Sequence, residues 1–402
     1  MSAPRRVLLL ALDNWYSTSR LPYALKTAGL EVGLATQPGT MVSDSIHLDR
    51  CYTRRRQRDQ RGWLAWLRDA ILDFQPDFVI PADEDAVRVC HFILLQRKHS
   101  WPRSIVDVLQ RSIGDVKTLP DRSHRDAILR RARRLGIEVP IGRVVRRKTD
   151  ADAFMRELHR RAVLKTDHSF GGQGVVICQD RQQLDSAYIR LSERSLEVSG
   201  RPWARLREAV RRGVFGADPV FEGGGRSQLH VETKIEGRPV FHTAVAQDGV
   251  CLDGFSADVE LCYPLPTGPS SRVTLYHCAQ MAAFTQALVA DLGFSGFCGL
   301  DFIRSDDGRL TLLEFNQRPT SVSHLGHHVG ADLFAALASG RGGVVANRGH
   351  ATQCVALFPQ DWLRDPAAQD RATFVVDRPD EEPDILKTML GRIGQAKAAR
   401  VA

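Results

Sequence analysis

Residues 299–320 read Gly-Leu-Asp-Phe-Ile-Arg-Ser-Asp-Asp-Gly-Arg-Leu-Thr-Leu-Leu-Glu-Phe-Asn-Gln-Arg-Pro-Thr, and this stretch decides the fold. Asp307-Gly308 predicts a two-residue hairpin turn, because a type I′ turn needs positive φ at both central positions. The strands then continue through residues 305–306 and 309–310. Counting outward in step places Asp301 directly opposite Glu314.

Two facing carboxylates repel each other unless a cation lies between them. Asn316 and Arg318 follow Glu314 at a period of two, so they share its face of the strand. A solvated hairpin face is the alternative, but the other positions of both strands are apolar, at Phe302, Leu312, Leu313 and Phe315. Buried carboxylates need partners, and oxygen ligands suit a hard cation. We therefore interpret Asp301, Glu314 and Asn316 as a magnesium site, with Mn²⁺ as a substitute.

Composition sets broad bounds on this chain. Its 402 residues suffice for two or three domains, and the 43% apolar and 25% charged contents are ordinary for a globular protein. No run of eighteen apolar residues occurs, so no membrane span is expected. The eight cysteines are scattered without a Cys-x-x-Cys pair, which indicates neither zinc nor disulfides and fits a reducing cytoplasm.

The net charge of +8 comes mostly from clustered arginines, which could contact nucleic acid. In the segment 123–135, however, Ile128, Ala132 and Leu135 form an apolar stripe at helical spacing, with arginines opposite. This pattern favours an amphipathic helix with a solvated face over a nucleic-acid surface.

The first 112 residues alternate between strands and helices. Apolar runs at 7–11, 32–36 and 77–81 predict buried strands, and helices are expected at 19–28, at 61–74 and after Asp83-Glu84. This alternation predicts a parallel sheet with helices on its faces. A Gly-x-Gly-x-x-Gly motif is absent, so a dinucleotide site is not indicated.

A glycine-rich loop follows a predicted strand at 162–166 that carries Lys165. The loop reads His168-Ser169-Phe170-Gly171-Gly172-Gln173-Gly174, and a second strand is expected at 175–178. Such a loop lets backbone N–H groups approach phosphate oxygens, and Lys165 would add a positive charge. In isolation it would be a plain flexible turn, but together with the acidic hairpin it indicates an ATP site.

Further elements are expected along the rest of the chain. Strands are predicted at 142–145, 229–235, 239–246, 250–261 and 354–358, and helices at 150–161, 181–212, 271–292 and 332–337.

Taken together, these motifs over residues 113–340 resemble the ATP-grasp superfamily. Glu232-Thr233-Lys234-Ile235-Glu236-Gly237 is similar to its adenine-binding hinge, and Asp301 followed by Glu314-x-Asn316 matches its magnesium set. Asn316-Gln317-Arg318-Pro319 resembles the branch that contains biotin carboxylase and the carbamoyl-phosphate synthetase large chain. The first 112 residues resemble the domain that precedes ATP-grasp in those enzymes.

The resemblance implies an α/β fold, α+β in its catalytic part. A parallel-sheet domain (1–112) would precede a two-lobed ATP-grasp fold (113–230 and 231–345) and a C-terminal extension (346–402). Three departures from the family occur: Arg125 replaces a lysine eleven residues before Gly136, Pro239 replaces a ribose-binding acid, and the glycine-rich loop has Phe170 and Gln173 among its glycines. The implied ATP-binding residues are Arg125, Lys165, Ser169, Gly171, Gly172, Gly174, Glu232, Thr233, Ile235 and Leu313.

The activity that this resemblance implies is ligation. ATP would phosphorylate a small carboxylate, and an amine or similar nucleophile would displace phosphate, with Arg318 and Lys165 as catalytic residues. A kinase and a non-catalytic nucleotide sensor are the alternatives. Phosphate release distinguishes the kinase, while the complete set of charged residues argues against the sensor. No nucleic-acid or membrane partner is expected, and a homodimer is left open.

Overall fold

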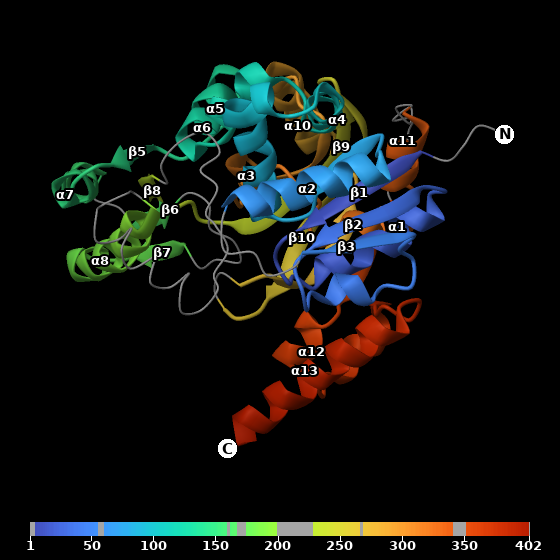
Figure 1. Ribbon diagram of the computed structural model, residues 1–402. Coiled ribbons are helices and arrows are strands. Elements are labelled where there is room, and N and C mark those ends of the chain that lie inside the picture. The colour runs from blue at the N-terminus through green and yellow to red at the C-terminus, as the bar shows by residue number, and fades with distance from the viewer. Residues whose placement is uncertain are drawn as a thin grey trace.

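The structure is a computed structural model, and it describes residues 5–54, 60–158, 161–166, 174–198, 228–265, 268–340 and 351–401. Three sheets organise the molecule, with helices packed between and around them (Figure 1). Ser169, Gly171 and Gly172 lie outside the described residues. Among the helices described, none has the length and apolar character needed to cross a bilayer.

The N-terminal sheet is parallel, as the alternating pattern predicts. Its order is β3-β2-β1-β4. Its strands are β1 (Arg6–Ala11), β2 (Glu31–Thr36), β3 (Arg50–Thr53) and β4 (Phe78–Pro81), and its helices are α1 (Leu21–Thr27), α2 (Gln60–Phe74), α3 (Glu84–Phe92) and α4 (Arg103–Ile113). Asp83 caps α3 by accepting the N–H of Ala86 at 2.8 Å.

The two faces of β1 belong to different cores because strand side chains alternate. Leu8 and Leu10 pack with residues of α2, α3 and α4. Leu9 instead belongs to a core that contains Phe241 and Phe297 of the large sheet. The N-terminal sheet is therefore joined to the rest of the molecule by a continuous apolar core.

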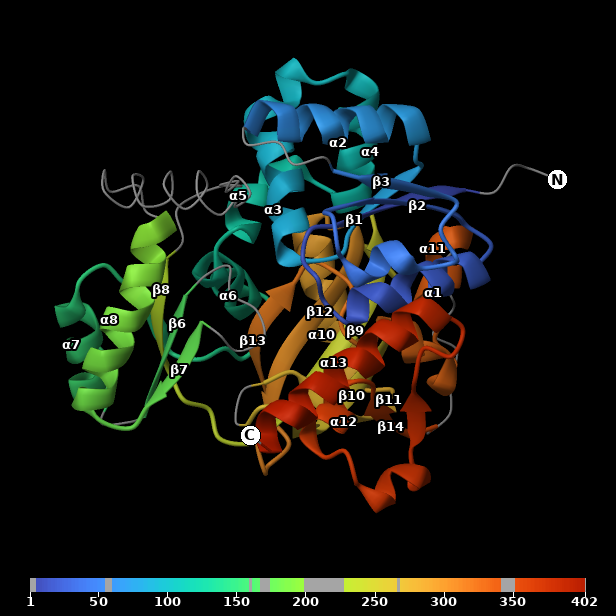
Figure 2. The ribbon, with the colours of Figure 1, turned by 60° about the horizontal axis from the view of Figure 1, so that its bottom comes forward.

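A small antiparallel sheet with the order β5-β8-β6-β7 forms a separate lobe (Figures 1 and 2). It comprises β5 (Gly142–Val145), β6 (Ala162–Thr166), β7 (Val175–Cys178) and β8 (Leu229–Thr233), with α7 (Lys148–Leu158) and α8 (Arg181–Val198) against it. Its own core includes Phe154, Leu164, Leu184 and Val231.

The large sheet has seven strands in the order β13-β12-β9-β10-β11-β14-β15. These are β9 (Arg238–Gln247), β10 (Val250–Cys262), β11 (Ser270–Tyr276), β12 (Gly296–Arg304), β13 (Leu310–Asn316), β14 (Gln353–Leu357) and β15 (Val375–Asp377). Residues of α6 (Arg125–Arg134) and α10 (Ala279–Leu292) share a core with β12 and β13. α11 (Leu333–Ser339) packs in the core that reaches the N-terminal sheet.

Two expectations about helices are wrong in part. The single helix predicted at 271–292 is β11 followed by α10, so its first part is a strand paired with β10 and β14. The stripe predicted for residues 123–135 is buried at Ile128 and Ala132, but Leu135 is 38% exposed because α6 ends at Arg134.

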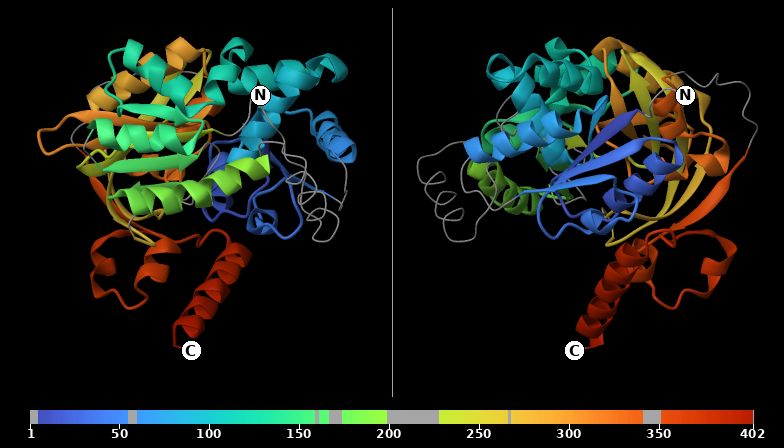
Figure 3. Two further views of the ribbon diagram at one scale, coloured as in Figure 1. Left: turned by 90° about the vertical axis from the view of Figure 1, so that its left-hand side faces the viewer. Right: turned by 45° about the vertical axis from the view of Figure 1, so that its right-hand side comes forward.

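The C-terminal residues add β14, β15, α12 (Gln360–Arg364) and α13 (Pro383–Val401). Asp361 is fully buried, and its carboxylate oxygens accept hydrogen bonds from Arg272 and Arg371, each at 2.9 Å. Ile385 and Met389 of α13 pack against Met41 and Phe358. α13 thus lies along the outside of the molecule and ends away from the sheets (Figure 3).

Candidate functional site

In the acidic hairpin Asp301 faces Glu314, as the sequence predicts, but the loop length and the register next to the loop differ from the prediction. Its loop has three residues, because Ser305 N–H donates to Arg309 O at 3.0 Å and so faces Arg309. This shifts the predicted pairing of 305–306 with 309–310 by one residue. A β-bulge at Leu313, between the pairs Phe302–Leu312 and Asp301–Glu314, restores the register.

The two hairpin carboxylates lie in different surroundings. Burial, and after it the charge of the facing Glu314, raise the pKa of Asp301 to about 6. Asn316 Nδ2 donates to Asp301 Oδ2 at 3.0 Å, so the amide lies on the same face as the carboxylates. The Glu314 side chain remains 42% exposed. Asp301 therefore carries a charge that is poorly compensated by the surrounding protein groups.

A buried carboxylate in the small sheet holds two cations. Glu232 on β8 accepts from Arg125 Nε through Oε1 at 2.8 Å, and its Oε2 lies 2.8 Å from Lys165 Nζ. Although burial raises the pKa of Glu232, Arg125 and Lys165 together lower it to about 2. For Lys165, burial and the neighbouring Arg125 lower the pKa. The three residues form one desolvated, charge-coupled group.

Arg125 connects this group to the hairpin. Its Nη1 lies 3.4 Å from Glu314 Oε1, and Nη2 donates to the backbone oxygen of Leu313. Because Leu313 is the bulged residue, its carbonyl is available for this contact. The first residue of α6 thus holds the two lobes of the site together.

Arg318 also lies beside the hairpin, but its partner is the first residue of α3, a helix of the N-terminal part of the chain. Its Nε donates to Glu84 Oε1 at 2.9 Å. Burial raises the pKa of Glu84, whereas Arg318 opposes that change. The sequence marked Glu84 only as part of a helix start, so no local signal identified this contact.

The remaining residues of the ATP-binding prediction flank this group. Thr233 ends β8, and its N–H donates to Ile141 O at 2.8 Å; Ile235 follows and is half-buried. Gly174 is buried, and its carbonyl accepts the N–H of Thr166 at 3.0 Å. Ser169, Gly171 and Gly172 of the glycine-rich loop lie outside the described residues.

A cleft opens beside the hairpin, between α3 and the start of α6. Its space is about 700 Å³, part of it open to solvent. Glu314, Asn316 and Arg125 line one side, and Glu84 and Arg88 line another. The cleft therefore gives a small molecule access to the charged group.

The donor set fits a hard divalent cation bound together with a ligand. Within the described residues, no cluster of three or more His, Cys, Asp or Glu side chains is arranged to hold a metal. Asp301, Glu314 and Asn316 offer two carboxylates and an amide, which are oxygen donors of the kind that Mg²⁺ accepts when substrate phosphates and water complete its shell. Burial and the charge of Glu314 raise the pKa of Asp301, so a cation bound beside both carboxylates would favour their charged forms.

Comparisons with known proteins identify structural neighbours. No protein-family model matches the sequence, and no curated protein matches it. The biotin carboxylase domain dimer of 2-oxoglutarate carboxylase from Hydrogenobacter thermophilus, solved with MgADP, ADP and bicarbonate, superposes with a TM-score of 0.62 at 15% identity. That match covers 88% of this chain and 74% of that chain.

Two other neighbours have related folds. N5-carboxyaminoimidazole ribonucleotide synthetase with ADP gives a TM-score of 0.55 at 14% identity, over 83% of this chain and 75% of that chain. The L-amino acid ligase from Bacillus licheniformis gives 0.54 at 12% identity, over 84% and 74%. The chain shares its fold with these three proteins. The chain has the ATP-grasp fold, with the N-terminal parallel sheet that the sequence predicts.

Proposed function

We propose that this protein is an ATP-dependent ligase that joins a small carboxylate to an amine or similar nucleophile through an acyl phosphate, forming ADP and phosphate. The observation that carries the proposal is the coupling of Glu232, Arg125 and Lys165 to the facing pair Asp301 and Glu314. Two cations and two opposed carboxylates within one contact network form a complementary site for a nucleotide phosphate chain with its metal.

Each group has a chemical role in this proposal. Lys165 and Arg125 would bind phosphate oxygens, and Asp301, Glu314 and Asn316 would hold Mg²⁺, with Mn²⁺ as a substitute. The bound cation would neutralise charge on the β- and γ-phosphates. Arg318 would stabilise negative charge on the transferred phosphoryl group, since a guanidinium fork matches phosphate oxygens.

The structural neighbours support this assignment through their chemistry. One neighbour was solved with MgADP and bicarbonate, another with ADP, and a third is an amino acid ligase. We extend nucleotide and magnesium use to this chain as part of the proposal, together with a small-molecule acid and amine as substrates.

The test is a screen of carboxylates and amines for ADP formation, with free phosphate measured in parallel. A ligase forms ADP and free phosphate in equal amounts when both substrates are present. ADP without free phosphate would indicate transfer to a stable acceptor, as in a kinase. Absence of MgADP binding would contradict the proposal altogether.

A further inference from the structure

Arg122, the last residue of α5 (Leu119–Arg122), is a buried cation whose role the proposed ligase reaction does not include. The residue is 4% exposed, and its guanidinium lies 4.8 Å from the ring centroid of Phe294. Burial lowers the pKa of Arg122 to about 9, which still leaves it charged at neutral pH. It lines the same cleft as Glu314 and Asn316.

The hydrogen bonds of Arg122 are to neutral acceptors. Nε donates to Gln317 Oε1 and Nη1 to Ile113 O, both at 2.7 Å. Within the described part of the chain, Arg122 takes part in no ion pair, and its Nη2 has no hydrogen-bond partner. A buried charge without a counterion is costly, so a structural role by itself accounts poorly for an arginine here.

The other charges of the cleft are already compensated. Glu84 faces Arg318, and Glu314 faces Arg125. Arg88 lies 3.2 Å from Asp85 on its own helix. The carboxylates that line the cleft are thus engaged by other arginines, and Arg122 contributes a positive charge that they do not neutralise.

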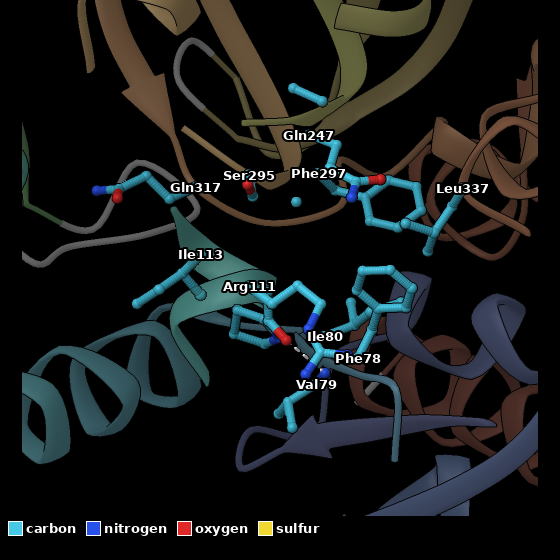
Figure 4. Close-up of a pocket in the computed structure, with 14 residues that line it drawn as sticks. Phe78, Val79, Ile80, Arg111, Ile113, Gln247, Ser295, Phe297, Gln317 and Leu337 are labelled. Atoms are coloured by element: carbon cyan, nitrogen blue, oxygen red, sulfur yellow. Dashed lines mark hydrogen bonds between the residues drawn. The ribbon is translucent and has the colours of Figure 1, made fainter. Parts of the chain in front are cut away.

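Gln317 and Ile113 fix the position of this cation. Both residues line a second cavity, whose space is about 400 Å³ with part of it open to solvent, and Figure 4 shows them at one end of it. Gln317 Nε2 returns a hydrogen bond to Arg122 O at 2.8 Å. Arg122 is therefore held in place at the boundary between the two cavities, with part of its fork unused.

From this arrangement we infer that the cleft binds an organic substrate through an oxyanion, a carboxylate or a phosphate, held by Arg122. This inference rests on the proposed ligase function and narrows it: the substrate carries this anionic group in addition to the group that reacts beside Glu314 and Asn316. The planar guanidinium fork suits either oxyanion.

The experiment measures the affinity of two probes, succinate and inorganic phosphate, by calorimetric titration without nucleotide. Wild-type protein should bind at least one probe, and whichever binds more tightly identifies the oxyanion. Arg122→Gln should weaken that binding by roughly tenfold or more, as loss of a charge-assisted hydrogen bond does. Arg111→Gln is the matched control, since Arg111 is exposed and lines the second cavity. The affinity of Arg111→Gln for the same probe should equal that of the wild type.

One further variant keeps the test decisive even if Arg122→Gln fails to fold. Gln317→Glu supplies Arg122 with an internal counterion, so it should also abolish probe binding. Absence of probe binding in the wild type, or unchanged affinity in folded Arg122→Gln or Gln317→Glu, would overturn the inference. MgADP titration of the same preparations tests the ligase proposal separately.

Discussion

At the scale of single residues, the site depends on one buried carboxylate. Glu232 compensates Arg125 and Lys165 at once, and each of the three is at most 11% exposed. Desolvated ion pairs give specificity of position more readily than stability. The sequence predicted Glu232 as part of an adenine hinge, and that role stays a prediction. Its pairing with two cations had no sequence signal, since the three residues are distant along the chain.

The pH dependence of stability should reveal this pairing. The folded pKa of Glu232 is about 2, below the usual 4.5, so its stabilising contribution is complete above pH 4.5 and disappears as pH falls towards 2. That difference corresponds to at most about 3 kcal/mol. Glu232→Gln should lower the free energy of unfolding at pH 7 by about 3–5 kcal/mol, because it leaves two buried cations underpaired.

Urea unfolding at a series of pH values measures this effect. The gap between wild type and Glu232→Gln should narrow between pH 4.5 and pH 2, as Glu232 of the wild type becomes protonated. A constant gap over that range would show that Glu232 is not ionised in the folded protein.

Glu314 is the residue through which the metal proposal can be tested. Glu314→Gln should abolish ATP turnover while the fold survives, because its side chain is partly exposed. The Mg²⁺ concentration needed for nucleotide binding should rise by roughly tenfold or more, since ligand charge sets cation affinity. Glu138→Gln, an exposed carboxylate beside β13, is the control. Undiminished turnover of Glu314→Gln at low Mg²⁺ would contradict the metal assignment.

At the scale of elements, the hairpin shows how far local patterns extend. Asp307-Gly308 located the turn, but the loop holds one residue more than the pattern indicates, and the bulge at Leu313 compensates. The pairing of Asp301 with Glu314 was predicted correctly. The loop length and the bulge were not predicted, because bulges have no reliable sequence signal. The apolar residues on the other face of the hairpin fix the strand register, and this register makes the two carboxylates face each other.

The strand β11 was missed for a related reason. Leu275, Cys278 and Ala282 have helical spacing, which extended the predicted helix backward to 271. Val273 and Leu275 are instead alternate core positions of a strand, fully buried between β10 and β14. Short apolar runs fit both periods, and only the neighbouring strands decide between them.

Glycine in the predicted hinge gives a prediction at this scale. Gly237 has φ of +142°, and a Cβ there would lie 2.3 Å from Arg304 O. Gly237→Ala should therefore destabilise the fold by about 1–3 kcal/mol and weaken ATP binding, because β8 and β9 meet at this turn. Gly308 has φ of +84°, and a Cβ there would have nothing within 4 Å, so Gly308→Ala should cost about 1 kcal/mol.

Urea unfolding and nucleotide titration of both variants provide the comparison. Equal losses of stability in the two variants would mean that glycine is needed at position 237 for its backbone conformation, and not because Arg304 approaches closely. Unchanged ATP affinity in Gly237→Ala would place the nucleotide away from the hinge.

At the scale of the whole molecule, contacts between residues far apart in the sequence determine features that the sequence did not predict. The ATP-grasp fold was predictable because its motifs occur in order along the chain. The shared core of β1 with the large sheet and the addition of β14 and β15 to its edge were not, because residues far apart in the sequence form them. The ion pair between Glu84 and Arg318 was not predictable for the same reason.

Arg318 therefore joins two parts of the molecule and is proposed to act on the transferred phosphoryl group. An interaction made mainly during transfer affects turnover more than ground-state binding. Arg318→Ala should bind ATP with Mg²⁺ within several-fold of the wild type, yet lose turnover by roughly a hundredfold or more. Arg318→Lys should recover little, since a point charge does not reproduce the fork.

Glu84→Gln separates this role from a purely structural one. If Arg318 serves only to pair with Glu84, removing either partner should lower stability and turnover to the same extent, and the double variant should add nothing. If Arg318 acts on the phosphoryl group, Glu84→Gln should retain most of the turnover that Arg318→Ala loses, because the guanidinium remains beside the hairpin. ATP affinity, ADP formation and urea unfolding of the two single variants and the double variant decide between these outcomes. Proportional losses of ATP binding and turnover in Arg318→Ala would assign Arg318 to ground-state support.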